Sequence, residues 1–460
     1  MRTLLIPWHE RSLTERVVRL GLLVVAIIGV VLTRFYGTMT AESDSVFLFG
    51  VVNEIVTPSW VMKEIGRRLV NNLKFAANVM RSYDGQYVQS GAKQGFTVNA
   101  RLPQRFKVNK GQALNPQPVV DRVVPITLSD QANVGIEFST ASLTMEVDSY
   151  REKCIAPAID TLANAVDSDG LVRSYKDIYW TVGVPGTNPA SNSIYLDAGV
   201  KLDNASVPES QRVSMLSSGM HAAIANANVA IFNPATTVSE IFRKGQFGKE
   251  ALGISEWFKD QNVDTHTVGA LGGTPLVVGA SQTGSTVDID GWTAAVGNRL
   301  LEGDVIQLAG TRSTNTQSYR STGQLQDFVV TADVESDATG LTSDVPISPS
   351  ITVAGNLQTV TASPADNAIV TIFGHASSYA GLTSAQGLVY HPEAFALVMA
   401  DLEMPEGLWV SERVSNEALG IAIRFLKDYS IMTDQSPARV DVLYGWKTVR
   451  AEMAVRVCGG

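Results

Sequence analysis

The sequence predicts an α+β fold that is interrupted by a separate all-β domain, and three observations support this. Apolar residues recur at helical spacing in residues 61–77 and 143–166. Alternating runs typical of strands fill residues 91–139 and return near the C-terminus. Residues 281–362 contain no Lys and are rich in Ser, Thr, Gly, Asp and Val, with short alternating runs between turn signals. Such a segment favours a small β-barrel or sandwich.

Length and charge limit the class of protein. A chain of 460 residues is long enough for about two or three domains. Charged residues make up 18% of it, against roughly 25% in typical globular proteins, which indicates that neighbouring subunits or lipid cover part of the surface. The net charge of −9 argues against nucleic-acid binding by the chain as a whole. Cys154 and Cys458 form neither a disulfide framework nor a zinc site, and we expect both to be buried thiols.

The most apolar run is LGLLVVAIIGVVL, residues 20–32, preceded by several arginines. It has 13 residues, whereas a helix needs about 20 to cross a bilayer. A basic start and an apolar run of this length resemble a signal peptide. Residues 1–38 are therefore interpreted as an upstream extension from a mis-assigned start, with Met39 as the true beginning, or as a processed leader. A membrane-anchored or secreted surface protein, adhesive through its β domain, is the alternative.

Residues 39–90 contain the first amphipathic helix, and residues 91–139 then predict a long two-stranded hairpin or extended loop without a core of its own. Residues 91–128 hold six basic residues against Asp121, a net +5: Lys93, Arg101, Arg105, Lys107, Lys110 and Arg122. Residues 401–417 hold five acidic residues against Arg413, a net −4: Asp401, Glu403, Glu406, Glu412 and Glu417. The basic arm is either simply solvated or docked on this acidic segment. Nucleic acid is a third partner, although few aromatic residues are present for base stacking.

Residues 143–166 predict a long helix that Pro157 kinks or breaks. The helix is expected to end near Ser168-Asp169-Gly170, with Gly170 as a left-handed cap. Irregular structure is expected for residues 171–210 because they are rich in Gly, Pro, Asn and Ser. A second helix is predicted over residues 212–231.

Further elements follow in chain order. We expect a short helix at 235–245, a buried strand at 272–279, a strand at 368–374, a helix at 388–402, and paired strands at 422–434 and 438–457. Catalytic patterns are scarce along the whole chain. None of His9, His221, His266, His375 and His391 belongs to an HExxH pair, and neither a nucleophile elbow nor a phosphate-binding loop occurs. His391, before a proline, is expected to cap or pack. The sequence predicts no catalytic residue, cofactor or metal site, and hence no enzyme.

The order of segments, with LLEGDVIQLAG (300–310), HPEAFALV (391–398) and DVLYGWKTVRAEMAVRV (441–457), resembles the tailed-bacteriophage major capsid proteins of the Hong Kong 97-like fold. The similar branch carries an inserted β-barrel. The resemblance spans roughly residues 42–457 and implies a set of named parts. These are an N-arm (39–90), an extended loop (91–139), a spine helix of the peripheral domain (140–170), an axial domain (171–280 and 363–440), an inserted β domain (281–362), and a C-terminal strand and tail (441–460).

The resemblance also implies a function, assembly. Such subunits form hexamers and pentamers, close around a scaffolding protein into an icosahedral shell with a portal protein, and expand as double-stranded DNA is packaged. The extended loop reaches over a neighbour, and a decoration protein binds some members. Some members join a loop lysine to a neighbour's asparagine. Lys93, Lys107 and Lys110 are available here, but non-covalent assembly is expected. The implied location is the virion, assembled in the host cytoplasm without membrane or cofactor.

Overall fold

The computed structural model describes residues 74–81, 97–112, 114, 116–119, 121–139, 156–228, 251–373, 379–416 and 421–460. Several predictions lie outside this set. They concern the extension 1–38 with its apolar run, most of the first amphipathic helix, the short helix at 235–245, Lys93, Cys154, His375 and Glu417. Among the described residues, no helix combines the length and apolar character that crossing a membrane requires.

The long helix α5 (Ala156–Lys176) continues past the point where the sequence predicts its end. The predicted left-handed cap at Gly170 is wrong, because this glycine has helical rather than positive φ. A Cβ atom at Gly170 would lie 2.6 Å from two ring atoms of Trp446. The glycine is therefore explained by close packing of an aromatic ring on the helix.

Helix α5 also packs against the short helix α3 (Lys74–Ala77). The Asp167 carboxylate accepts hydrogen bonds from the backbone N–H groups of Lys74, Phe75 and Ala76, at 3.0, 3.1 and 2.9 Å. These bonds cap the start of α3. Burial raises the pKa of Asp167 to about 6, against the opposite effect of the three N–H groups. Phe75 stacks on Trp446 with ring centroids 5.1 Å apart, so α3 is fixed at both its backbone and its side chain.

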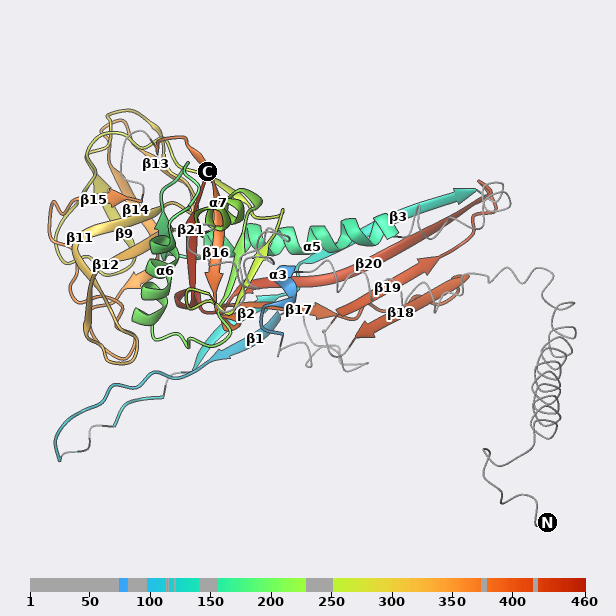
Figure 1. The fold of residues 1–460 in the computed structure, drawn as a ribbon, viewed down its shortest axis with the longest axis horizontal. Helices are drawn as coiled ribbons and strands as arrows, with labels where there is room; N and C mark the ends of the chain where they lie inside the picture. The colour runs from blue at the N-terminus through green and yellow to red at the C-terminus, as the bar shows by residue number, and fades with distance from the viewer. Residues whose placement is uncertain are drawn as a thin grey trace, which may run out of the picture. The chain divides into compact units, whose positions relative to one another are not determined.

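The helix α5 packs on a sheet built around the 14-residue strand β20 (Gln435–Thr448). One edge of β20 pairs with β3 (Asp130–Ser139). The other edge pairs with β17 (Phe395–Ala400) and β19 (Ile421–Lys427), and β19 pairs in turn with β18 (Val410–Asn416). Figure 1 shows α5 lying along β20. The predicted pairing of the 422–434 and 438–457 segments is confirmed between residues 424–427 and 438–441, whereas the end of β20 up to Thr448 pairs with β17.

A second sheet follows the order β4 (Thr181–Gly183), β21 (Ala454–Cys458), β16 (Thr383–Tyr390), β5 (Val213–Leu216) and β6 (Glu256–Lys259). The strand β7 (Thr265–Thr267) also pairs with β16. Helix α6 (Asn192–Asn204) follows strand β4 in the chain, and helix α7 (Ser218–Asn228) follows strand β5. Cys458 is a buried free thiol, as expected.

Three predictions in this region are wrong in part. Residues 171–210 are not irregular, since they contain the end of α5, strand β4 and helix α6. Residues 212–231 begin with a strand, β5, before helix α7. The 388–402 segment is not a helix, because β16, the 3-10 turn η5 (Pro392–Ala394) and strand β17 occupy it. Every residue of β17 is buried, so its apolar run carries no alternation that would separate a strand from a helix.

The all-β part contains a six-stranded sheet. Its order is β15 (Val370–Ile372), β11 (Val305–Thr314), β12 (Ser321–Val330), β14 (Thr342–Ile351), β9 (Gly284–Asp290) and β8 (Leu276–Val277). Strands β10 (Gly297–Leu300) and β13 (Val334–Ser336) form a separate pair. Trp292, Phe328 and Ile347 belong to one buried apolar cluster within it. We call residues 276–372 the β-module. It begins before and ends after the 281–362 segment that the composition marks.

Buried polar contacts join the β-module to the second sheet and its helices. Lys201 of α6 pairs with the fully buried Asp327 of β12 and donates to the Thr181 carbonyl at 2.7 Å. Arg456 of β21, also buried, donates to the Gly303 carbonyl at 2.8 Å. His266 of β7 contacts Asp304 at 2.8 Å. Because such groups are costly to bury unpaired, these contacts restrict how the module sits on the sheet.

The contact between Gly170 and Trp446 predicts the direction in which a substitution changes the free energy of unfolding. We expect Gly170→Ala to lower the free energy of unfolding of the unassembled subunit by about 1–3 kcal/mol, because the buried ring has no room to move. Gly199→Ala in α6 is the matched control, since a Cβ there meets nothing within 4 Å. It should raise the free energy by up to about 1 kcal/mol. Denaturant unfolding measures both, and a stabilising Gly170→Ala would contradict the packing argument.

Candidate inter-subunit contact site

The predicted hairpin is present in the described residues as strands β1 (Thr97–Leu102) and β2 (Arg122–Thr127), paired antiparallel from Thr97↔Thr127 to Leu102↔Arg122. Its base packs on the body of the protein. Ala100, Ile126 and Leu128 lie in one buried cluster with Ala396 and Val398 of β17. This contact stabilises a two-stranded ribbon that would be marginal by itself. Residues 130–139 of the predicted loop differ, because β3 pairs with β20 along its whole length.

Beyond the paired strands, residues 103–121 form the tip, which contains no regular strand in its described part (Figure 1). Large apolar side chains are exposed there: Phe106 at 55%, Val119 at 72%, Val108 at 84% and Leu114 at 90%. Gln117 accepts from the Lys107 N–H at 2.9 Å and donates to the Lys107 carbonyl, so its side chain links the two limbs of the tip. Several exposed apolar side chains in one segment are typical of a surface that contacts another protein.

The basic residues of the hairpin have different surroundings. Arg101 lies 3.7 Å from Asp121, with both side chains largely exposed. The Lys107 ammonium lies 5.5 Å from the ring centroid of Tyr319, in the turn between β11 and β12. Lys110 is exposed. Among the described basic residues of the hairpin, Arg105 and Arg122 alone are partly buried, and both lie at its base.

The acidic segment lies on and before β18, at the edge of the sheet. Asp401 pairs with Arg413 at 3.0 Å, and Glu403 and Glu406 are exposed. Burial raises the pKa of Glu412. Exposed apolar residues adjoin the segment. They are Trp409 next to β18, and Ile431 and Met432 in the turn after β19.

Within the described part of the chain, no basic residue of the hairpin forms an ion pair with residues 401–416. Arg105 instead pairs with Glu452 at 2.7 Å, with about a fifth of each side chain exposed. A contact between the two segments in different copies stays a prediction. Glu452 was missed by sequence reasoning. It lies 347 residues from Arg105 and outside both charged segments, so no local pattern marks it.

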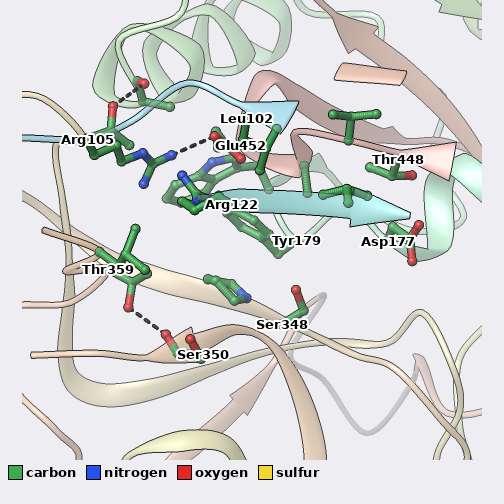
Figure 2. Close-up of a pocket in the computed structure, with 18 of the residues that line it drawn as sticks. Leu102, Arg105, Arg122, Asp177, Tyr179, Ser348, Ser350, Thr359, Thr448 and Glu452 are labelled. Carbon is green, nitrogen blue, oxygen red and sulfur yellow. Dashed lines mark hydrogen bonds and ion pairs between the residues drawn. The ribbon is translucent and has the colours of Figure 1, made fainter. Parts of the chain in front are cut away.

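Glu452 lies at the centre of a charged cluster. Its carboxylate is 2.7 Å from the Arg105 guanidinium and 3.6 Å from that of Arg450, which also contacts Glu393 at 2.9 Å. Arg122 extends from β2 beside Arg105 and Glu452 (Figure 2). Arg105, Arg122 and Glu452 line both a cavity of about 410 Å³ and an adjoining one of about 260 Å³, and Arg450 lines the smaller one. The base of the hairpin is therefore both an anchor and the wall of a cavity.

The described residues give no sign of other chemistry. No three His, Cys, Asp or Glu side chains among them gather as metal ligands. His391 accepts from the Glu393 N–H at 3.4 Å and caps η5, which confirms the expected capping role. The hairpin, the acidic edge and the cavity are thus the features that a function must explain.

The chain was compared with known protein families, curated proteins and solved structures. A family model described as "P22 coat protein - gene protein 5" matches residues 126–459. No curated protein matches the chain. Among solved structures, one from Mycobacterium phage Che8 is similar at 12% identity and a TM-score of 0.42, over 83% of this chain and 90% of that one. The capsid of Ralstonia phage GP4 is similar at 7% identity and a TM-score of 0.39, over 80% and 84%.

The Glu452 cluster predicts a stability effect. Glu452→Gln should lower the free energy of unfolding of the unassembled subunit by about 1–3 kcal/mol, because it leaves partly buried arginines without their carboxylate. Glu393→Gln, at a side chain that is 49% exposed, should change it by less than about 1 kcal/mol. Adding Arg122→Gln to Glu452→Gln should recover part of the loss. Denaturant unfolding measures all three variants. Equal effects of Glu452→Gln and Glu393→Gln would refute the claim that Glu452 anchors the base of the hairpin.

Proposed function

The chain belongs to the P22 coat protein family, and on that premise we propose that it assembles as hexamers and pentamers of an icosahedral phage head that encloses double-stranded DNA. Family membership makes it a structural capsid protein of the virion rather than an enzyme, with the α+β Hong Kong 97-like fold. The observation that carries the finer proposal is the hairpin tip, whose exposed apolar residues have no cover in the described part of the chain.

The hairpin tip suits a contact between copies for a physical reason. Val108, Leu114 and Val119 are each more than two-thirds exposed, and water around them is released when another surface covers them. Lys107 and Lys110 stand in the same segment. A surface with apolar residues between charges gains free energy from the apolar part and selects its partner through the charges.

The proposed acceptor is the acidic edge of a neighbouring copy, at residues 401–416. Glu403 and Glu406 are exposed and available, whereas Asp401 is already paired with Arg413. The exposed Trp409, Ile431 and Met432 lie at the same end of the sheet as the start of β18 and give this surface an apolar component of its own. Complementary charge supports docking of the tip here, and the contact is non-covalent.

We further propose the remaining partners on the strength of family resemblance. They are a scaffolding protein during assembly in the host cytoplasm, a portal protein at one vertex, packaged DNA held without sequence preference, and a decoration protein on the outside. A net charge of −9 supports weak contact with DNA, since a strongly basic inner surface would hold the phosphates and oppose ejection.

The direct test is assembly of the purified chain. Expressed from Met39 with its scaffolding protein, it should form closed shells or capsomer-sized particles in electron micrographs. A full-length chain from Met1 serves as the comparison for the role of the extension. A protein that stays monomeric at all concentrations, with scaffold present, would refute the proposal.

The pairing of the tip with the acidic edge predicts a charge rescue. Lys107→Glu with Lys110→Glu should slow assembly by about tenfold at low salt, because two attractions become repulsions. Arg105 is left unchanged because it anchors the hairpin through Glu452. Adding Glu403→Lys and Glu406→Lys to the same chain should restore part of the rate in light scattering. Assembly that is slow in both variants, with unchanged subunit stability, would rule out this pairing.

A further inference from the structure

The cavity at the base of the hairpin contains one arginine without a partner. Arg122 lies on β2, about half buried, and its guanidinium makes no hydrogen bond or ion pair with any residue that the structure describes. The neighbouring Arg105 is paired with Glu452 at 2.7 Å. Burial, and next the charge of Arg105, lower the pKa of Arg122. An arginine keeps its proton even so, and an unpaired buried charge is costly.

The charges around Arg122 do not cancel. Four basic groups, of Arg105, Arg122, Lys447 and Arg450, stand against three carboxylates, of Glu452, Glu393 and Asp177. Glu452 and Glu393 each have an arginine within 3.0 Å. One positive charge is therefore in excess, and among these three arginines Arg122 is the one that forms no ion pair with a described residue.

The walls of the cavity can receive a polar side chain. The wall opposite Arg122 belongs to the β-module and carries the hydroxyl groups of Ser348, Ser350 and Thr359 (Figure 2). The amide of Gln326 also lines it. The volume of about 410 Å³ is many times the ~30 Å³ share of one water molecule. It is large enough to admit a side chain.

We propose that an acidic side chain from a neighbouring copy of this chain enters the cavity and pairs with Arg122. This inference rests on the proposed assembly function. A second copy is the favoured occupant because the chain has nine more acidic than basic residues and because the cavity is bounded by the hairpin that assembly would use. The carboxylate would complete the Glu452 cluster and hold the hairpin base in the assembled state.

The proposal predicts effects of opposite sign on the subunit and on the shell. In the unassembled subunit, Arg122→Gln removes a desolvated charge and its repulsion of Arg105, so the melting temperature should stay unchanged or rise by about 2 °C. In assembly the same change removes an ion-pair partner and should raise the concentration needed for shell formation by about tenfold or more. An arginine with a purely structural role would lower stability instead.

The test compares Arg122→Gln with Arg320→Gln, which removes the same charge from an exposed position in the β11–β12 turn. Melting of unassembled subunits and sedimentation of shells are measured for both variants and for the unchanged protein. Impaired assembly with undiminished melting temperature, for Arg122→Gln alone, is the expected result. Wild-type-like assembly of Arg122→Gln, or a fall in its melting temperature as large as that of Glu452→Gln, would overturn the proposal.

A free anion is distinguished by adding millimolar inorganic phosphate, with chloride at matched ionic strength as control. Stabilisation of the unassembled subunit by phosphate, lost in Arg122→Gln, would mean that a small oxyanion fills the site and would overturn the proposal. No phosphate effect is expected. If the unchanged protein itself forms no shells, the assembly function fails, whereas shells formed equally by both variants refute only the role of Arg122.

Discussion

The close contact between Gly170 of α5 and the Trp446 ring of β20 is the constraint on which the rest of the structure depends. The indole N–H donates to the Val166 carbonyl at 3.1 Å, and the Tyr444 hydroxyl contacts Asp169 at 2.5 Å, so the strand is fixed to the helix over a full turn. Phe75 stacks on the same ring. Because β20 pairs with β3, β17 and β19, fixing this one strand places the whole sheet against the helix.

The hairpin takes its position from the same sheet. Its base packs on β17, which is paired with the part of β20 that carries Trp446. The ion pair from Arg105 to Glu452 then fixes the point where the tip leaves the body. A tip with exposed apolar residues can stay extended only if its base is held in this way, since a free ribbon would collapse onto the nearest apolar surface. Glu452 therefore contributes to the stability of the subunit and also holds the hairpin that is proposed to act in assembly.

The β-module has a core of its own, yet buried polar contacts connect it to the rest. Lys201 with Asp327, and Arg456 with the Gly303 carbonyl, cross from α6 and β21 into the module. A purely apolar junction would tolerate sliding, whereas such groups are satisfied in one arrangement only. This matters for the cavity, because one wall comes from the module and the other from the hairpin. A module that shifted would change the shape of the site around Arg122.

Local pattern was enough for the α+β class, for the hairpin and for the existence of an all-β segment, because alternation and composition are properties of neighbouring residues. The capsid family was indicated by resemblance to known proteins and not by these patterns. The basic charge of the hairpin was likewise visible in residues 91–128. Tertiary structure decided the rest. In the sequence Gly170 resembles a helix cap, and only the structure shows that Trp446 packs on it. The sequence of β17 resembles a helix, because burial on both faces of the sheet removes the alternation of apolar and polar residues. Glu452, far from Arg105 in sequence, became part of the site only when the fold brought the two side chains together. A sequence records which charges exist, whereas pairing depends on distance and burial, which are set by packing between remote segments.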